Sequence, residues 1–154
     1  MRAVTVVLVA VLALAGAVPA TGEPQDSDVD AARDPDYAAG KEAIASKDWR
    51  RAVERFERVV RREPDNADVQ NYLGFAYRNL GDLPCALLHY RHALEINPRH
   101  RGAHEYAGEA QLMAGNLDKA LEHLAAPRQI CLMPCEELTD LERAITAYRA
   151  RTGR

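Results

Sequence analysis

Two of the three cysteines in this 154-residue chain stand four residues apart, in the stretch "QICLMPCEEL". Cys131 and Cys135 could form a disulfide, bind a soft ion such as Cu(I) together with Met133, or act as a redox pair. At helical i,i+4 spacing their Cα atoms would lie ~6 Å apart, which is within disulfide range. The two glutamates that follow the pair disfavour a reactive thiolate. A disulfide that holds the C-terminal segment in place is therefore the favoured interpretation, ahead of a metal site and a redox site.

The remaining residues that could do chemistry do not converge on a site. Cys85 lies in a different segment, and we predict that it is unpaired. His89 with His92, and His100 with His104, are spaced for one helical face, but zinc needs three or four ligands, and flanking arginines would repel a cation. We expect surface histidines. The chain has no G-x-S-x-G, H-E-x-x-H or phosphate-loop motif, so we expect no enzyme, no metal and no cofactor.

The net charge and the N-terminal sequence indicate which class of partner and which compartment to expect. Basic and acidic residues are mixed along the chain, with a net charge of −3, which gives no footprint for nucleic acid. Residues 1–20 have one arginine, an apolar run and a small-residue ending, as in a secretory signal peptide cleaved after Ala20. An uncleaved anchor is the alternative. Residues 21–33 are acidic and predict a flexible leader.

We therefore expect a secreted protein, located in a bacterial periplasm, with no membrane span once the signal is removed. The apolar run from Ala3 to Val18 is shorter than the ~20 residues that a spanning helix needs. An oxidising compartment of this kind also favours pairing of two nearby cysteines.

Beyond residue 33 the sequence repeats itself every 34 residues, and such a period indicates stacked structural units. In the second unit, Leu73 and Tyr77 fall at helical spacing, Gly81 ends that helix, Pro84 starts another and Pro98 stops it. Each unit therefore predicts a helix, a turn and a second helix. The columns in register hold small, aromatic and proline residues: Gly40, Gly74 and Gly108; Ala52, Ala86 and Ala120; Phe56, Tyr90 and Leu124; Pro64 and Pro98.

The small columns predict close approach of the two helices of a unit, with Tyr90 and its equivalents filling the space toward the next unit. These columns resemble those of the tetratricopeptide repeat (TPR) family. The resemblance implies an all-α fold, an α-solenoid in which residues 34–134 form three TPR units (33–66, 67–100 and 101–134). Unit one has Ala43, and unit three Gln111, where the family has tyrosine.

The last unit departs further from the repeat, because Pro127 stands where the family has alanine. Proline removes a helical hydrogen bond, so we expect the helix to end near Ala126, with a kinked extension to about Cys131 as the alternative. Residues 135–151 then form one amphipathic helix, which we expect to cap the array. Its apolar stripe consists of Leu138, Leu141, Ile145 and Tyr148.

The family resemblance also implies a concave face lined by the first helix of each unit. We expect Asn71 to hold a peptide backbone, Arg78 to bind a carboxylate, and Phe75 to form an apolar pocket with Leu112 and Met113. For Leu112 and Met113, a place in the hydrophobic core is an equally good alternative to a place in this pocket. The lysine-rich carboxylate clamp of some chaperone-binding members is not present as a set. Carried over by position, the groove residues are Tyr37, Lys41, Ile44, Asn71, Phe75, Arg78, Asn79, Glu105, Glu109, Leu112 and Met113.

These residues predict a non-catalytic protein–protein interaction module of the bacterial envelope, which binds a peptide segment of a protein partner in the groove. The alternative is a periplasmic thiol or Cu(I)-handling protein that uses Cys131 and Cys135. A third possibility rests on family analogy: some periplasmic repeat proteins hold clients during cytochrome assembly or act in envelope complexes. The ending "CEELTDLERAI" is similar to that of small secreted bacterial repeat proteins.

Overall fold

All regular secondary structure in the described part of the chain is helical. The computed structural model describes residues 33–133 and 135–153, so the expected signal peptide and nearly all of the expected leader lie outside the described residues. The helices are α2 (Pro35–Ala45), α3 (Trp49–Arg62), α4 (Ala67–Asn79), α5 (Leu83–Ile96), α6 (Arg101–Met113), α7 (Leu117–Ile130) and α8 (Glu136–Thr152).

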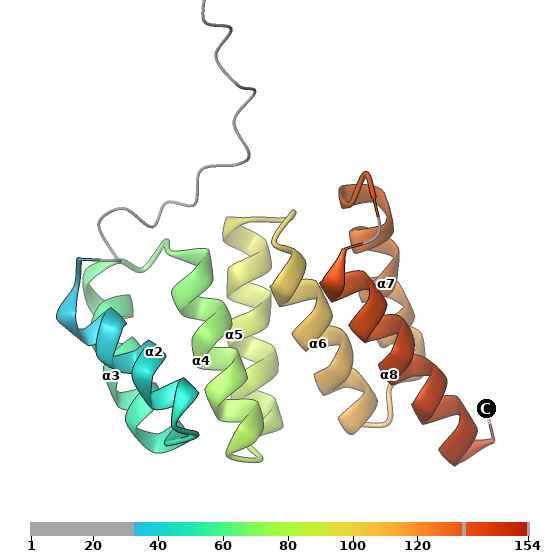
Figure 1. The fold of residues 1–154 in the computed structure, drawn as a ribbon, viewed down its shortest axis with the longest axis horizontal. Helices are drawn as coiled ribbons and strands as arrows, with labels where there is room; N and C mark the ends of the chain where they lie inside the picture. The colour runs from blue at the N-terminus through green and yellow to red at the C-terminus, as the bar shows by residue number, and fades with distance from the viewer. Residues whose placement is uncertain (1–32, 134, 154) are drawn as a thin grey trace, which may run out of the picture.

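The helices form three hairpins in a row, followed by one more helix (Figure 1). The pairs α2–α3, α4–α5 and α6–α7 are the three predicted units, and α8 packs against both α6 and α7. In Figure 1, α2, α4, α6 and α8 form the layer nearer the viewer, and α3, α5 and α7 lie behind it. We call these the first-helix layer and the second-helix layer. The predicted all-α solenoid with a capping helix is confirmed.

The turn inside each hairpin repeats the same backbone conformation. Gly81 and Gly115 have φ of +84° and +81°, and Lys47, which occupies the same column in unit one, has φ of 58°. Glycine adopts this left-handed conformation without strain, whereas another residue pays about 1 kcal/mol. The side chains of Asp48 and Asp82 then cap the next helices by accepting backbone N–H groups at 3.2 and 3.1 Å.

The glycine column is where the side chains of a neighbouring helix come closest to the backbone. A Cβ atom built on Gly74 would lie 2.5 Å from the ring of Tyr90, a distance that real atoms do not reach. The Tyr90 ring thus lies on the glycine of its own unit rather than only toward the next one, although its centroid is also 6.3 Å from that of Tyr106. Gly40 and Phe56 repeat this contact in unit one.

Unit three replaces this contact with one from the capping helix. A Cβ atom on Gly108 would lie 2.7 Å from Leu141 of α8, not against a side chain of α7. Leu141 is fully buried, and Ile145 and Tyr148 are buried beside it. The stripe predicted for the C-terminal helix therefore covers the face that the last hairpin would otherwise leave open, as a cap must.

Helix α7 continues through Pro127 and ends at Ile130, so the expected end near Ala126 is wrong and the extension to Cys131 is found. Pro127 is fully buried, which indicates that packing of its ring offsets the hydrogen bond it cannot donate. Its carbonyl still accepts the N–H of Cys131 at 2.8 Å.

Cys131 and Cys135 form a disulfide across the loop between α7 and α8. Their Cα atoms are 6.1 Å apart. Cys131 is the residue that ends α7 and Cys135 the one that precedes α8, so the bond joins two helices instead of lying within one. The predicted disulfide is confirmed, and it fixes the point from which the capping helix starts.

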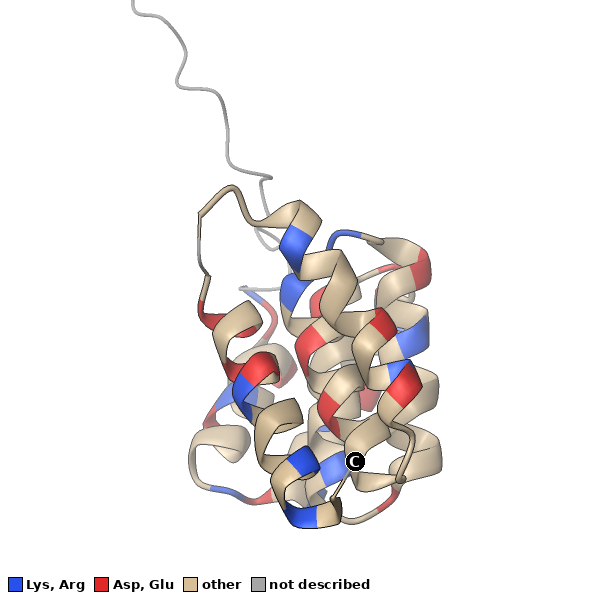
Figure 2. Ribbon diagram, turned by 90° about the vertical axis from the view of Figure 1, so that its right-hand side faces the viewer, with Lys and Arg blue, Asp and Glu red and all other residues tan. Residues whose placement is uncertain are grey.

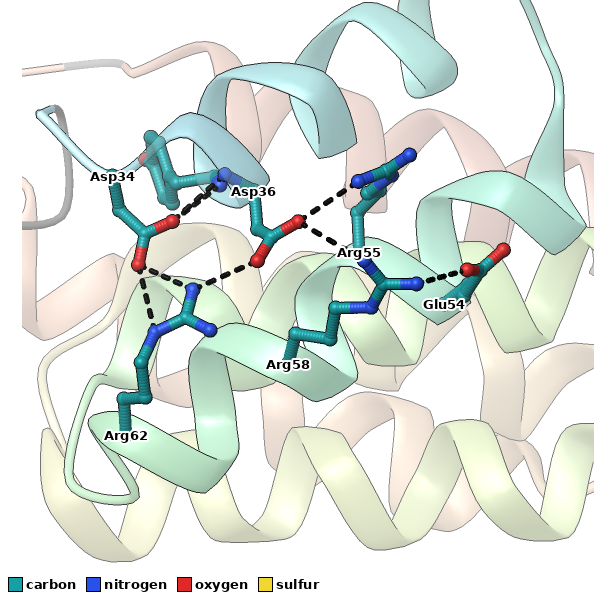
Figure 3. A network of polar contacts seen from close by, with 7 residues as sticks. Asp34, Asp36, Glu54, Arg55, Arg58 and Arg62 are labelled. Carbon is teal, nitrogen blue, oxygen red and sulfur yellow. Dashed lines mark hydrogen bonds and ion pairs between the residues drawn. The ribbon is translucent and has the colours of Figure 1, made fainter.

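Ion pairs hold the start of α2 against α3 (Figure 3). Arg62 donates to Asp34 at 2.5 Å and to Asp36 at 3.0 Å, and Arg55 donates to Asp36 at 3.0 Å. Asp34 also caps α2 by accepting the N–H of Asp36 at 2.7 Å. The hydrogen bond from Arg55, with those from Arg62, lowers the pKa of Asp36. This network holds α2, the first of the described helices, against α3.

We predict that Gly74→Ala destabilises the protein by about 1–3 kcal/mol, because the added methyl overlaps the Tyr90 ring. The matched control is Gly102→Ala in α6, where the nearest atom to the new Cβ is 3.4 Å away. That change should stabilise by about 0.5–1 kcal/mol, since alanine lowers the entropy of the unfolded chain. Urea unfolding followed by circular dichroism measures both. Equal effects of the two substitutions would contradict the contact.

Candidate functional site

A row of aromatic rings extends from Trp49 at the start of α3, across Phe75 of α4, to Tyr106 of α6. The centroid of Phe75 lies 5.8 Å from that of Trp49 and 5.0 Å from that of Tyr106. The Arg78 guanidinium lies over the rings of Phe75 and Tyr106, at 5.3 and 5.2 Å. Arg78 also forms an ion pair with Glu109 of α6. These contacts join α4 to α6 and give the layer a partly exposed apolar surface.

The groove residues carried over from the family divide into two groups by burial. Tyr37 and Leu112 belong to hydrophobic core clusters, so we leave them out of the candidate site. Met113 is 58 % exposed. The exposed or half-buried members are Lys41, Ile44, Phe75, Arg78, Asn79, Glu109 and Met113, and the buried ones are Tyr37, Asn71, Glu105 and Leu112.

Three of the polar groove residues already have partners within the chain. Arg78, expected to bind a partner's carboxylate, binds Glu109 instead. The Nζ of Lys41 donates to the hydroxyl of Tyr72 at 2.5 Å. The amide of Asn79 donates to a backbone carbonyl one turn earlier, at 2.8 Å. Arg78 and Lys41 therefore already have partners within the chain, so this face offers few free positive charges to bind an acidic peptide.

Beside the aromatic row, a polar hollow of about 330 Å³ opens between α4, α6 and α8. We call it the acidic hollow, because its lining holds five carboxylates. Figure 2 views the molecule from the α8 end and shows that the first turns of α8 are acidic while its last turn is basic. The lining residues are Asp68, Asn71, Tyr72, His100, Gly102, Glu105, Tyr106, Glu136, Glu137 and Asp140.

Some carboxylates of the hollow have hydrogen-bond or ion-pair partners within the chain. The Nδ1 of His100 accepts the N–H of Ala103 at 3.1 Å, so its Nε2 carries the proton and donates to Asp68 at 2.8 Å. Arg143 donates to Asp140 at 2.6 Å. A third pair joins α6 to α8, between Arg101 and Glu137 at 3.6 Å.

Glu105 has no such partner. Its side chain makes no hydrogen bond or ion pair with the described residues, although the residue is only 8 % exposed. Burial, together with the carboxylates of Glu109, Asp140 and Glu137, raises the pKa of Glu105 to about 8. Asn71 on the adjoining helix is 5 % exposed, and its Oδ1 has no donor within the described structure. Buried polar atoms of this kind are normally satisfied.

Sequence reasoning found Asn71 and Glu105 but missed the rest of the hollow. Tyr72 and Tyr106 stand 34 residues apart, next to those two residues. This second column could have identified the aromatic wall. Glu137 and Asp140 carried no signal beyond their favourable place at a helix start, because their contact with α6 depends on how α8 packs.

The histidines were expected on the surface, but they lie half-buried at contacts between helices. His89 stacks on Tyr77 with centroids 5.3 Å apart, and the Nδ1 atoms of His104 and His123 are 3.3 Å apart. Burial and His104 lower the pKa of His123 to about 4. Their role in the described structure is to fill helix interfaces.

Within the chain, Cys85 is a free cysteine, as predicted. A hydrogen bond with Asp82, and then burial, raise the pKa of its thiol, which disfavours the reactive thiolate. In the described ranges no group of three or more His, Cys, Asp or Glu is placed to hold a metal ion. None of the helices in these ranges is long and apolar enough to cross a membrane.

The family model for the tetratricopeptide repeat matches residues 37–100 and 76–129. The chain belongs to the tetratricopeptide repeat family. A comparison with curated protein sequences gives no match.

Three solved TPR-like structures illustrate the shared fold. The TPR2B domain of yeast Sti1, solved as a complex with pHsp70, has a TM-score of 0.70 at 22% identity and covers 75% of this chain and 94% of its own. The first TPR of Spaghetti (RPAP3), bound to the HSP90 peptide SRMEEVD, has a TM-score of 0.63 at 17% identity, covering 70% and 86%. A MamA D159K mutant has a TM-score of 0.55 at 22% identity, covering 82% and 65%.

We predict that Glu105→Gln stabilises the protein at pH 9 but not at pH 5. The folded-state pKa of Glu105 is about 8, above the ordinary value of 4.5, so its contribution is present below the ordinary value and is lost as the pH rises through 8. Glutamine never ionises, and the gain at pH 9 should be about 1–2 kcal/mol. Urea unfolding at both pH values measures it.

The control for this prediction is Glu122→Gln, which removes an exposed carboxylate from α7. Its effect should be small and nearly the same at both pH values. If Glu105→Gln behaved as this control does, the burial and isolation of Glu105 would be contradicted.

Proposed function

We propose that the protein is a non-catalytic binding module that holds a segment of a partner protein against the first-helix layer. The observation that carries this proposal is the combination of a partly exposed aromatic row and an adjoining hollow with unpaired polar groups. Phe75 and Tyr106 offer apolar contact area, and Asn71 offers an amide oxygen that has no donor within the described structure. Together these supply the pocket and the backbone contact that bind an extended segment.

The solved relatives support this proposal through the partners with which they were solved. The Sti1 domain was solved with pHsp70 and the Spaghetti domain with an HSP90 peptide. At identities of 22% and 17% the likeness establishes the fold alone. The use of that fold for segment binding is therefore part of the proposal, while the nature of the segment depends on this chain's own residues.

We place this module in the bacterial envelope. The support is the signal-like sequence of residues 1–20 and the disulfide between Cys131 and Cys135. Disulfides persist in the periplasm and in secreted proteins, whereas cytosolic thiols are kept reduced. The alternative function, a thiol or Cu(I) carrier, needs both sulfur atoms in the reduced state, in which they could act as soft ligands.

The binding proposal predicts that random 12-residue peptides selected on the immobilised protein lose affinity by about tenfold with Phe75→Ala, as for an aromatic interface residue. Calorimetry measures the affinities, and circular dichroism checks that the variant is folded. The control is Leu88→Ala, which truncates an exposed side chain of α5 in the second-helix layer. Failure to select any peptide, or loss of affinity with the Leu88 variant alone, would exclude the proposed face.

Replacing Cys131 and Cys135 together by serine separates the two candidate functions. A binding module should keep its peptide affinity within about twofold and lose about 2 kcal/mol of stability, because closing so short a loop constrains the unfolded chain only modestly. A carrier would lose Cu(I) binding or thiol exchange entirely. Titration of the reduced protein with Cu(I), alongside peptide calorimetry, distinguishes these results. Tight copper binding that the double variant abolishes would favour the carrier.

A further inference from the structure

The acidic hollow differs from an ordinary acidic surface, because two of its buried polar groups have no partner. Glu137 and Asp140 have cationic partners at 3.6 and 2.6 Å, and Asp68 accepts a hydrogen bond from the imidazole of His100 at 2.8 Å. Glu105 and the Oδ1 of Asn71 have none in the described structure, although both residues are more than nine-tenths buried. A fully buried oxygen that lacks a hydrogen bond, such as the Oδ1 of Asn71, raises the free energy of the protein. A ligand that supplied donors would remove that penalty.

We propose that the acidic hollow binds the guanidinium group of an arginine in the partner segment. This inference rests on the proposed function and names the chemistry of the bound segment. An arginine brings a positive charge to the lining carboxylates and up to five N–H donors. One donor edge can face Glu105, while another reaches the Oδ1 of Asn71 if the amide turns, because that oxygen is buried in the free protein.

The walls of the hollow favour an arginine over other cations. Tyr72 and Tyr106 line it together with the carboxylates, but Lys41 already lies over the Tyr72 ring at 4.3 Å and Arg78 over the Tyr106 ring at 5.2 Å. The preference for arginine therefore rests on its planar fork of donors, which can reach separated acceptors. A lysine ammonium is a compact, strongly hydrated charge that bridges separated acceptors less well. A bare metal ion does not fit, since no three candidate ligands in the described structure converge.

The same charges argue against an acidic segment such as SRMEEVD, which the Spaghetti domain binds. The acidic hollow holds five carboxylates, and the nearby cations Lys41 and Arg78 already contact Tyr72 and Glu109. A carboxylate placed there would meet like charges without a free counter-charge, which weakens binding at an interface. Charge complementarity therefore selects a basic segment.

Binding should also depend on pH through Glu105. The groups that face it are Asp68 and Arg78 from α4, Glu109 from its own helix, and Glu137 and Asp140 from α8, with His100 at the rim. Its pKa of about 8 in the free protein means that it is largely protonated at pH 7. A guanidinium beside it favours the ionised form, so affinity should rise from pH 7 to about pH 9.

The experiment titrates the full chain with N-acetyl-L-arginine amide and follows backbone amide resonances by NMR. The matched probe is N-acetyl-L-citrulline amide, which has the same shape without the charge. We expect saturable shifts at residues of the hollow with arginine amide, at least fivefold tighter than with citrulline amide. Glu105→Gln should weaken arginine binding about tenfold and abolish its rise with pH, whereas Glu122→Gln should leave it within twofold.

A second variant, Asp140→Asn, keeps the test independent of any folding defect at position 105, and it too should weaken arginine binding. Equal response to citrulline amide, equal response to N-acetyl-L-lysine amide, or shifts confined to other surfaces would overturn the proposal. The results that would overturn arginine binding can be told apart from those that would overturn the proposed binding of a partner segment. Arginine amide could bind the hollow while no 12-residue peptide is selected, and selected peptides could bind the aromatic row with no preference for arginine.

Discussion

The stack depends on one repeated contact, a bulky side chain that lies directly on a glycine of the first-helix layer. Phe56 on Gly40 and Tyr90 on Gly74 close the first two hairpins. At unit three the glycine receives its partner from α8 instead of from its own hairpin. Because each contact leaves no space for a Cβ atom, it fixes how near the helices lie and thereby positions every other side chain of the layer.

Gly108 is contacted by Leu141 of α8 and not by its own hairpin, and this contact connects the capping helix, the disulfide and the candidate site. Leu141 reaches that glycine only if α8 starts at the right place, and the bond between Cys131 and Cys135 sets the start. The same placement brings Asp140, the residue before Leu141, to the wall of the acidic hollow. The sequence predicts that the C-terminal segment caps and stabilises the array. Its position in the structure makes it part of the surface that a partner would contact as well.

The fold could be predicted from the sequence because its determinants recur at fixed spacing, and four columns with a 34-residue period leave few alternatives. The errors arose where a single tertiary contact decides. Pro127 stays inside α7 because its ring is buried. The helix propensities of neighbouring residues do not indicate that burial. Likewise, the isolation of Glu105 depends on side chains from α4 and α8, so its sequence position alone indicated only a groove residue.

Retention of a buried, unpaired carboxyl group is hard to explain by packing. Glu105 lies in a first helix, where the equivalent residues of units one and two are Tyr37 and Asn71, which are uncharged. A neutral residue there would avoid both the burial of a charge and the repulsion by neighbouring carboxylates, which together raise the pKa of Glu105 to about 8. Sites of this kind, which oppose local stability, are where function is expected to override packing. The fold provides a surface for a segment, and a few residues such as Glu105 set the sign of the charge that the surface accepts.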